Sequence, residues 1–242
     1  MTPTVTPTPT STAGTPTLRV TNVLANSVRL SWDAAAAGTR YAVRLNGRTL
    51  GTVRTTAVRL VGLRPDSAYT AEIAIVAADR SLVPHTAPVE FRTAAVVMPA
   101  PGALITLANS LTGGAADVYG ARSADGTPVV LHRRHDGANQ RWRLEEAAAG
   151  VFRLESSATG KCLALALAGP SPRTGTALIQ RTCDATSTAQ QWRLQPTAYG
   201  FALAPVNADL VVGVGGARYY GRRPLVLQTP SQRRYQSWTA VT

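Results

Sequence analysis

The sequence has few of the residues that build reactive centres, and it has no long apolar run. Among its 242 residues are 3 histidines, 2 cysteines and a single lysine, Lys161. No stretch approaches the roughly 20 consecutive apolar residues that a membrane-spanning helix needs, so we expect no insertion into a membrane. The start of the chain also lacks the basic and apolar regions of a signal peptide. We therefore expect a secreted form to be a piece of a longer precursor.

The usual catalytic and metal-binding patterns are missing as well. His85, His132 and His135 stand in loop-like contexts without the spacing of metal ligands. Glu145 and Glu146 are neighbours, and neighbouring side chains on a strand point to opposite faces, which disfavours joint acid–base catalysis. No glycine-rich phosphate loop is present. We expect no catalytic residue, no metal and no cofactor.

Acidic residues are scarce beside basic ones, at 13 against 25, which gives a net charge of +12 and a pI near 10.9. This balance suits an acidic polysaccharide, nucleic acid or anionic lipid. The charge is spread along the chain, with 10 basic and 5 acidic residues in 18–95 and 15 and 8 in 96–242. That distribution favours a solvated, arginine-rich surface over a single polyanion site, and nucleic acid is not the expected partner.

Two regions of short strands follow a start rich in Thr and Pro. Residues 1–17 contain no large apolar residue except Val5, and we expect them to form a disordered linker. In residues 18–95, apolar and polar residues alternate in short segments, as in half-buried antiparallel strands. Asn46-Gly47 is a strong hairpin signal within this region. Residues 96–101 form a second, short linker, and residues 102–242 form the last region.

The first region resembles a fibronectin type III domain over residues 18–95. The resemblance depends on about seven short strands, an early Trp32 and the Leu-x-Pro-x-x-x-Tyr segment that ends at Tyr69. It implies a β-sandwich with both aromatic residues serving the core, and a tyrosine corner at Tyr69, whose hydroxyl bonds to the backbone. The expected role of this domain is that of a spacer.

The second region contains a repeated Gln-x-Trp motif. The three copies, Gln140–Trp142, Gln190–Trp192 and Gln236–Trp238, are spaced by 50 and 46 residues. Three copies of this length fit the three lobes of a trefoil. The triplicate motif resembles the ricin B-chain family, which includes R-type lectins and family-13 carbohydrate-binding modules, over residues 102–242. The whole chain is thus expected to be all-β, a fibronectin type III β-sandwich plus a β-trefoil whose repeated tryptophans fill the core.

In that family a sugar is held by a carboxylate, an aromatic ring and the Asn of an Asn-Gln-x-Trp segment. In the first lobe Asp117, Asn139 and Gln140 match this pattern, His132 stands at the aromatic position, and Tyr119 could add a platform for a sugar ring. These five residues are the predicted sugar-binding site. From the residues alone, Asp117 could equally be a turn residue and His132 a surface imidazole.

The other two lobes depart from the pattern at each position, so we expect neither to bind a neutral sugar. The second lobe has Ala164, Arg181 and Ala189 at the three positions, and the third lobe has Gly213, Gln228 and Tyr235. Several arginines of the third lobe would suit an acidic glycan, although a solvated face is the simpler interpretation. They are Arg218, Arg222, Arg223, Arg233 and Arg234.

The spacing of Cys162 and Cys183 alone allows two interpretations, a disulfide bridge or two buried free thiols. The family resemblance places a lobe disulfide at these positions, which implies an oxidising, extracellular location. The predicted function is non-catalytic carbohydrate binding through the first lobe, within a secreted glycoside hydrolase. The alternative is a structural or protein-interaction module whose degenerate trefoil no longer binds sugar.

Overall fold

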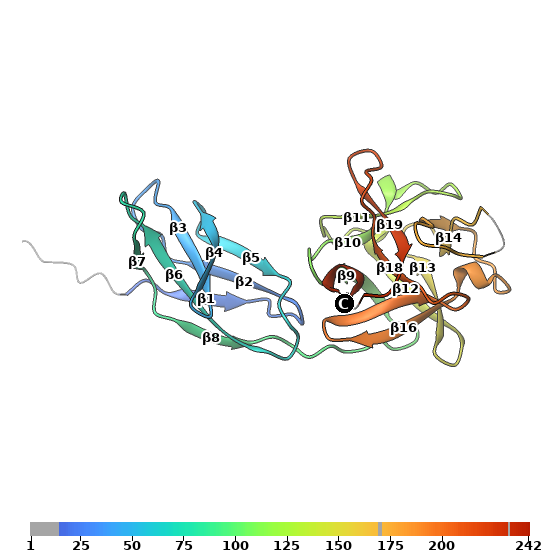
Figure 1. Cartoon of the computed structure of the whole chain (residues 1–242), viewed down its shortest axis with the longest axis horizontal. Coiled ribbons are helices and arrows are strands. Elements are labelled where there is room, and N and C mark those ends of the chain that lie inside the picture. The colour runs from blue at the N-terminus through green and yellow to red at the C-terminus, as the bar shows by residue number, and fades with distance from the viewer. Residues whose placement is uncertain (1–14, 169–170, 232) are drawn as a thin grey trace, which may run out of the picture. The chain divides into compact units, whose positions relative to one another are not determined.

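The computed structural model describes residues 15–168, 171–231 and 233–242 (Figure 1). These residues divide into two compact units. The larger contains Arg92–Thr242, and the smaller contains Arg29–Val58 and Tyr69–Phe91. Of the predicted N-terminal linker, residues 1–14 lie outside the described residues. No helix within the described ranges has the length and apolar character to cross a membrane.

Eight strands in the N-terminal half form two antiparallel sheets, ordered β1-β2-β5 and β4-β3-β6-β7, with β8 also paired to β6. They are β1 (Leu18–Thr21), β2 (Ser27–Trp32), β3 (Tyr41–Leu45), β4 (Arg48–Val53), β5 (Ala57–Val61), β6 (Ala68–Val76), β7 (Leu82–Pro84) and β8 (Val89–Arg92). Asn46 and Gly47 join β3 to β4 with positive φ angles of 50° and 74°. Such a pair fits the tight turn that Asn-Gly predicts.

The core of this half contains Trp32 and Tyr41, whose rings meet edge to face with centroids 5.5 Å apart. Tyr69 is half-buried and stacks on Phe91 at 5.6 Å. The predicted all-β class and the core position of Trp32 are therefore confirmed. The tyrosine-corner hydrogen bond of Tyr69 stays a prediction.

Twelve strands in three groups of four make up the described part of the C-terminal half. The first group is β9 (Leu104–Asn109), β10 (Ala115–Val118), β11 (Val129–His132) and β12 (Trp142–Ala148). The second is β13 (Val151–Ser156), β14 (Cys162–Leu165), β15 (Leu178–Arg181) and β16 (Trp192–Thr197). The third is β17 (Gly200–Pro205), β18 (Val211–Val214), β19 (Arg223–Gln228) and β20 (Trp238–Val241). Four 3-10 turns complete it, namely η1 (Tyr119–Ala121), η2 (Ala138–Gln140), η3 (Thr188–Gln190) and η4 (Arg234–Gln236).

The first and last strands of each group pair into a closed ring of six, β9-β12-β13-β16-β17-β20 and back to β9. The middle strands of each group form a hairpin, β10–β11, β14–β15 or β18–β19. A six-stranded ring with three hairpins is the predicted β-trefoil.

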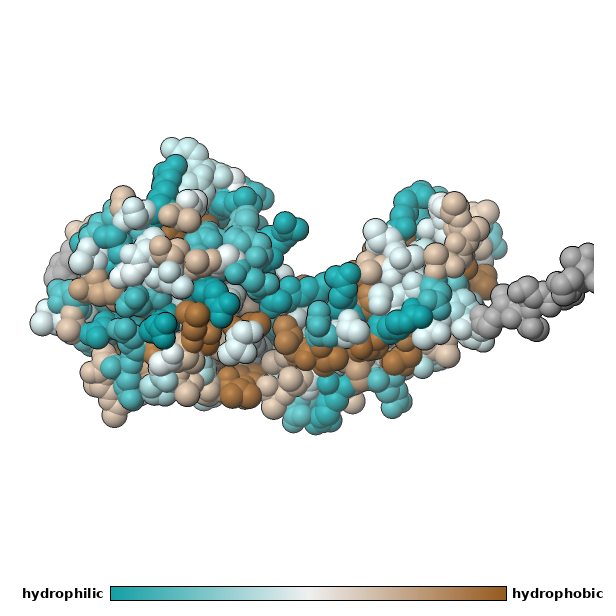
Figure 2. All heavy atoms as spheres, turned by 180° about the vertical axis from the view of Figure 1, so that it is seen from behind, coloured by the Kyte–Doolittle hydropathy of each residue, from teal (hydrophilic) through white to brown (hydrophobic). Residues whose placement is uncertain are grey.

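On the face drawn in Figure 2, hydrophilic and neutral side chains cover most of the surface.

The three repeated tryptophans lie at the centre of this fold and are at most 1% exposed. Each donates its indole N–H to a backbone carbonyl of the hairpin in its own lobe. The three bonds are Trp142 to Ala116, Trp192 to Leu163 and Trp238 to Val212, each 3.1 Å. The next residues along these hairpin strands, Asp117, Ala164 and Gly213, therefore occupy equivalent places in the three lobes.

Candidate functional site

Asp117 is the centre of the candidate site. It lies in β10, its side chain is only 6% exposed, and one of its carboxylate oxygens faces three partners. Oδ2 accepts a 2.8 Å hydrogen bond from Nε2 of Gln140 and lies 3.6 Å from Nδ1 of His132 and 3.4 Å from Nε2 of His135. The first lobe thus converges an amide and two imidazoles on one carboxylate.

Gln140 is fully buried and uses both ends of its amide. Its Oε1 accepts the backbone N–H of His135 at 2.9 Å, and its Nε2 also donates to the carbonyl of Arg133 at 3.0 Å. These bonds fold the loop after β11 around the Gln140 side chain. Gln140 therefore positions Asp117 and His135, and its amide has no end left open. Gln190 and Gln236 hold the corresponding loops in the same way.

Asn139 and Tyr119 lie at the end of β10, where the strand meets η1. Asn139 is half-buried and donates from Nδ2 to the carbonyl of Val118 at 3.2 Å. Tyr119 is the first residue of η1 and directly follows Val118, whose carbonyl Asn139 binds. The structure thus places the predicted site residues along β10, with His132 paired to Ala115 at its start and Tyr119 directly after its end.

His135 is the residue that the sequence analysis missed. His135 reaches Asp117 because the loop after β11 folds around Gln140. The Gln-x-Trp motif alone does not predict the path of that loop. The backbone N–H of Gly137 donates to Nδ1 of His135 at 3.2 Å. Since Nδ1 accepts, Nε2 carries the proton of the neutral ring and points it at Asp117.

Burial raises the pKa of Asp117 above its ordinary value, while the hydrogen bond from Gln140 and the two histidines act in the opposite direction. Burial also lowers the pKa of His132, and the charge of Arg222 adds to this effect. At neutral pH the site therefore offers a neutral His132 beside the carboxyl group of Asp117, a combination that can donate to and accept from hydroxyl groups.

A metal ion is the other ligand that these side chains could hold, because ligand atoms of Asp117, His132 and His135 all lie within 4.8 Å of one another. Binding through Nε2 of His135 would require the Gly137 hydrogen bond to break, since metal-bound histidines donate from the other ring nitrogen. A divalent cation would also lie near the charge of Arg222. The geometry favours hydrogen bonding to hydroxyls over metal coordination.

In the third lobe a side-chain amide fills the corresponding place. A Cβ atom on Gly213 would lie 2.0 Å from Oε1 of Gln228. Gln236 donates to this Oε1 at 3.0 Å, and Nε2 of Gln228 donates to the carbonyl of Val214 at 3.1 Å. The amide of Gln228 therefore fills the place that the carboxylate of Asp117 takes in the first lobe.

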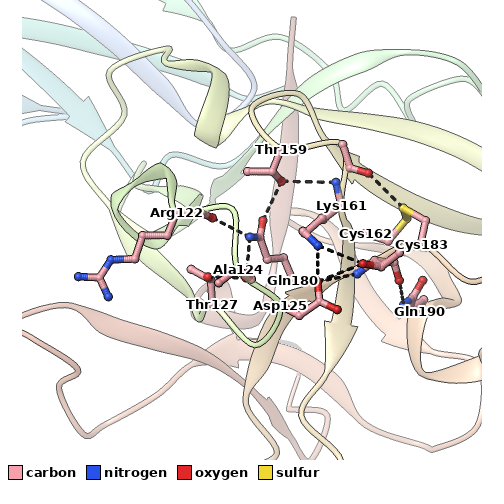
Figure 3. A network of polar contacts seen from close by, with 12 residues as sticks. Arg122, Ala124, Asp125, Thr127, Thr159, Lys161, Cys162, Gln180, Cys183 and Gln190 are labelled. Carbon is pink, nitrogen blue, oxygen red and sulfur yellow. Dashed lines mark hydrogen bonds and ion pairs between the residues drawn. A yellow bond between two sulfur atoms is a disulfide. The ribbon is translucent and has the colours of Figure 1, made fainter.

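The second lobe uses its polar residues for structure. Ala164 leaves no polar group at the position of the carboxylate. Figure 3 shows a network in which Gln180 donates to the carbonyls of Arg122 and Ala124, at 2.6 and 3.0 Å, and Lys161 forms an ion pair with Asp125. This network ties the loop after η1 to the second lobe.

The two cysteines are joined, which confirms the predicted disulfide. Cys162 of β14 is buried and Cys183 is exposed, and their Cα atoms are 5.0 Å apart. The bridge holds the segment after β15 against β14, within the same lobe as the network of Figure 3.

Comparisons with known proteins agree with this architecture. The model of the ricin-type beta-trefoil lectin domain-like family matches residues 95–171 and 138–225, and that of the fibronectin type III domain matches residues 12–92. No curated protein sequence matches the chain. A designed 3-fold symmetric protein, ThreeFoil, is 27% identical with a TM-score of 0.52, covering 57% of this chain and 98% of its own. The Rhizoctonia solani agglutinin is 20% identical with a TM-score of 0.52, covering 60% and 98%.

Proposed function

Because the chain belongs to the ricin-type β-trefoil lectin domain-like family, with a fibronectin type III domain ahead of the trefoil, we propose that it binds carbohydrate without catalysis through the first lobe. The observation that carries the proposal is the convergence of Gln140, His132 and His135 on the carboxylate of Asp117. The third lobe fills the same place with an amide, and the second has no polar group there.

In this site Asp117 accepts hydrogen bonds from adjacent sugar hydroxyls, and Gln140 holds the carboxylate in place. His132 provides a ring face and, as a neutral imidazole, one polar nitrogen. Asn139 and Tyr119 complete the border of the site. An imidazole covers less of a sugar ring than an indole, so we expect binding of one sugar to be weak.

A glycan array with the full chain tests this proposal, with Asp117→Asn as the main variant. Asn keeps the acceptor for Gln140 but removes the charge, and hydrogen bonds to a charged group are worth roughly 1.5–3 kcal/mol each. We expect at least about a tenfold loss of affinity. Asp184→Asn, which changes an exposed second-lobe carboxylate, is the matched control. Retained binding by Asp117→Asn would contradict the site assignment.

The loss of the pattern in two lobes supports a second candidate, a protein-interaction module with a degenerate trefoil. An array without glycan binding, together with capture of one defined protein partner, would favour this alternative. Nucleic acid, a third possibility, would show a steep dependence on salt. For the location we propose the extracellular space, with the chain as part of a secreted glycoside hydrolase. The Cys162–Cys183 bridge supports an oxidising environment.

A further inference from the structure

Three tyrosines from distant segments gather at the end of β10. Tyr119 belongs to η1, and Tyr219 and Tyr220 belong to the turn between β18 and β19. The ring centroids of Tyr119 lie 5.3 Å from Tyr219 and 5.9 Å from Tyr220, the latter pair being stacked. Tyr220 is nevertheless 74% exposed, so most of its ring surface faces solvent. The first and third lobes thus build one aromatic cluster.

The backbone at Tyr220 is not one that an aromatic residue prefers. Tyr219 and Arg222 close a two-residue turn with hydrogen bonds of 2.6 and 2.9 Å, and Arg218 donates to the carbonyl of Gly221. Tyr220 and Gly221 have positive φ angles of 43° and 76°. The first of these positions favours Asn, Asp or Gly in such turns, and strained residues held by their surroundings gather at binding sites. The conformation of this turn therefore does not account for a tyrosine at position 220.

Two connections join the aromatic cluster to the first-lobe site. Asn139 of the site donates to the carbonyl of Val118, the residue directly before Tyr119. From the third lobe, β19 pairs with β11, the strand that ends at His132. Arg222, just before β19, is close enough for its charge to lower the pKa of His132. A ligand seated at Asp117 would therefore reach the tyrosines by extending along one surface.

This surface also carries unpaired positive charge. Arg122, Arg218 and Arg222 are exposed, and none forms an ion pair with a carboxylate of the described residues. The guanidinium of Arg122 lies over the ring of Tyr119, 5.2 Å from its centroid. Gln180 fixes the backbone of Arg122, and Figure 3 shows the Arg122 side chain pointing away from that network. Arginine forks of this kind suit carboxylate and sulfate groups.

We propose that the first-lobe site continues onto this surface and takes an acidic oligosaccharide of several units. One sugar ring is held at Asp117 and a second stacks on Tyr220, while Arg122, Arg218 and Arg222 bind carboxylate or sulfate groups. The inference rests on the proposed function and adds a ligand class to it. Affinity should consequently depend on both the length and the charge of the glycan.

Calorimetry on the full chain tests this inference. The probes are galacturonic acid, its oligomers of two to six units, and carrageenan oligosaccharides of the same lengths. The first series carries carboxylate without sulfate and the second carries sulfate without carboxylate, so the two series distinguish the groups recognised. We expect affinity to rise about tenfold from one unit to four, the equivalent of roughly 1.4 kcal/mol. Tyr220→Asn places a favoured residue in the turn, so the fold is retained while the gain with length is lost.

Arg222→Gln should weaken binding of the acidic tetramer, whereas Arg181→Gln, which removes an exposed arginine of the second lobe, should not. Wild-type binding of the tetramer by Tyr220→Asn would overturn the proposal, as would equal losses from the two arginine variants. If neutral glycans bind through Asp117 but the acidic oligomers do not bind, the extension fails while the proposed function stands. If Asp117→Asn leaves all glycan binding unchanged, the proposed function fails.

Discussion

The first and third lobes share a frame but differ in the polar group that lies beside the buried glutamine. Each has a buried tryptophan bonded to its hairpin and a glutamine that holds a loop by both ends of its amide. In the first lobe the glutamine meets the carboxylate of Asp117, and in the third it meets the amide of Gln228 above Gly213. In both lobes the side-chain N–H of the buried glutamine thus has a hydrogen-bond acceptor. Only in the first lobe is that acceptor a carboxylate that a ligand can also bind.

Removing the core tryptophan of either lobe should lower the free energy of unfolding by a similar amount. Trp142→Ala and Trp238→Ala each leave a cavity in the core and an unpaired carbonyl, and each should lower the free energy of unfolding by about 3–5 kcal/mol. Denaturant unfolding followed by circular dichroism measures both losses. Leu111→Ala, at a side chain that is 44% exposed, is the control and should change stability by under about 0.5 kcal/mol. Very unequal losses would show that the lobes do not share one core.

The second lobe sharpens the comparison because its hairpin is held by a covalent bond. Replacing Cys162 and Cys183 together by alanine should cost roughly 3 kcal/mol, the chain-entropy value for a loop of this length. Glycan affinity at the first lobe should stay unchanged at temperatures where the protein is folded. Thermal unfolding and calorimetry on the same variant separate the two effects. A loss of affinity in the folded variant would mean that the second lobe takes part in binding.

The carboxylate of Asp117 should reduce stability in exchange for binding. Because burial raises its pKa, the folded state holds the proton more tightly than the unfolded state, so stability falls as pH rises above the ordinary value of 3.8. Asp117→Asn removes this penalty and should raise stability at neutral pH by about 0.5–2 kcal/mol. The gain should vanish below pH 3.8, where both states are protonated. Thermal unfolding across pH measures it, and a destabilised variant at neutral pH would contradict this account.

The sequence predicted the frame better than the site, for physical reasons. Gln-x-Trp recurs at a fixed period because each copy serves a core position, and the three indole bonds confirm that alignment. Asp117 and His132 could be placed by the same alignment. His135 could not, because its position depends on how the loop folds around Gln140. Nor could the approach of Tyr220, which is 101 positions from Tyr119 and reaches it only through pairing between lobes.

The smallest net effect on stability is expected when the Asp and His of the first lobe are both rebuilt in the third lobe. Gly213→Asp alone should cost about 1–3 kcal/mol, since its Cβ would overlap the amide of Gln228. Adding Gln228→His clears that space, and the new carboxylate can accept the hydrogen bond that Gln236 now gives to Gln228.

The double variant should therefore recover most of the lost stability, and calorimetry should find two weak glycan sites for each chain instead of one. Tyr235 still occupies the position of Asn139, so a triple variant with Tyr235→Asn isolates the contribution of the amide. If the triple variant still binds one glycan, a carboxylate, an imidazole and an amide in the shared frame are not sufficient. The first lobe would then owe its binding to features outside the repeat, of which the tyrosines shared with the third lobe are the first to test.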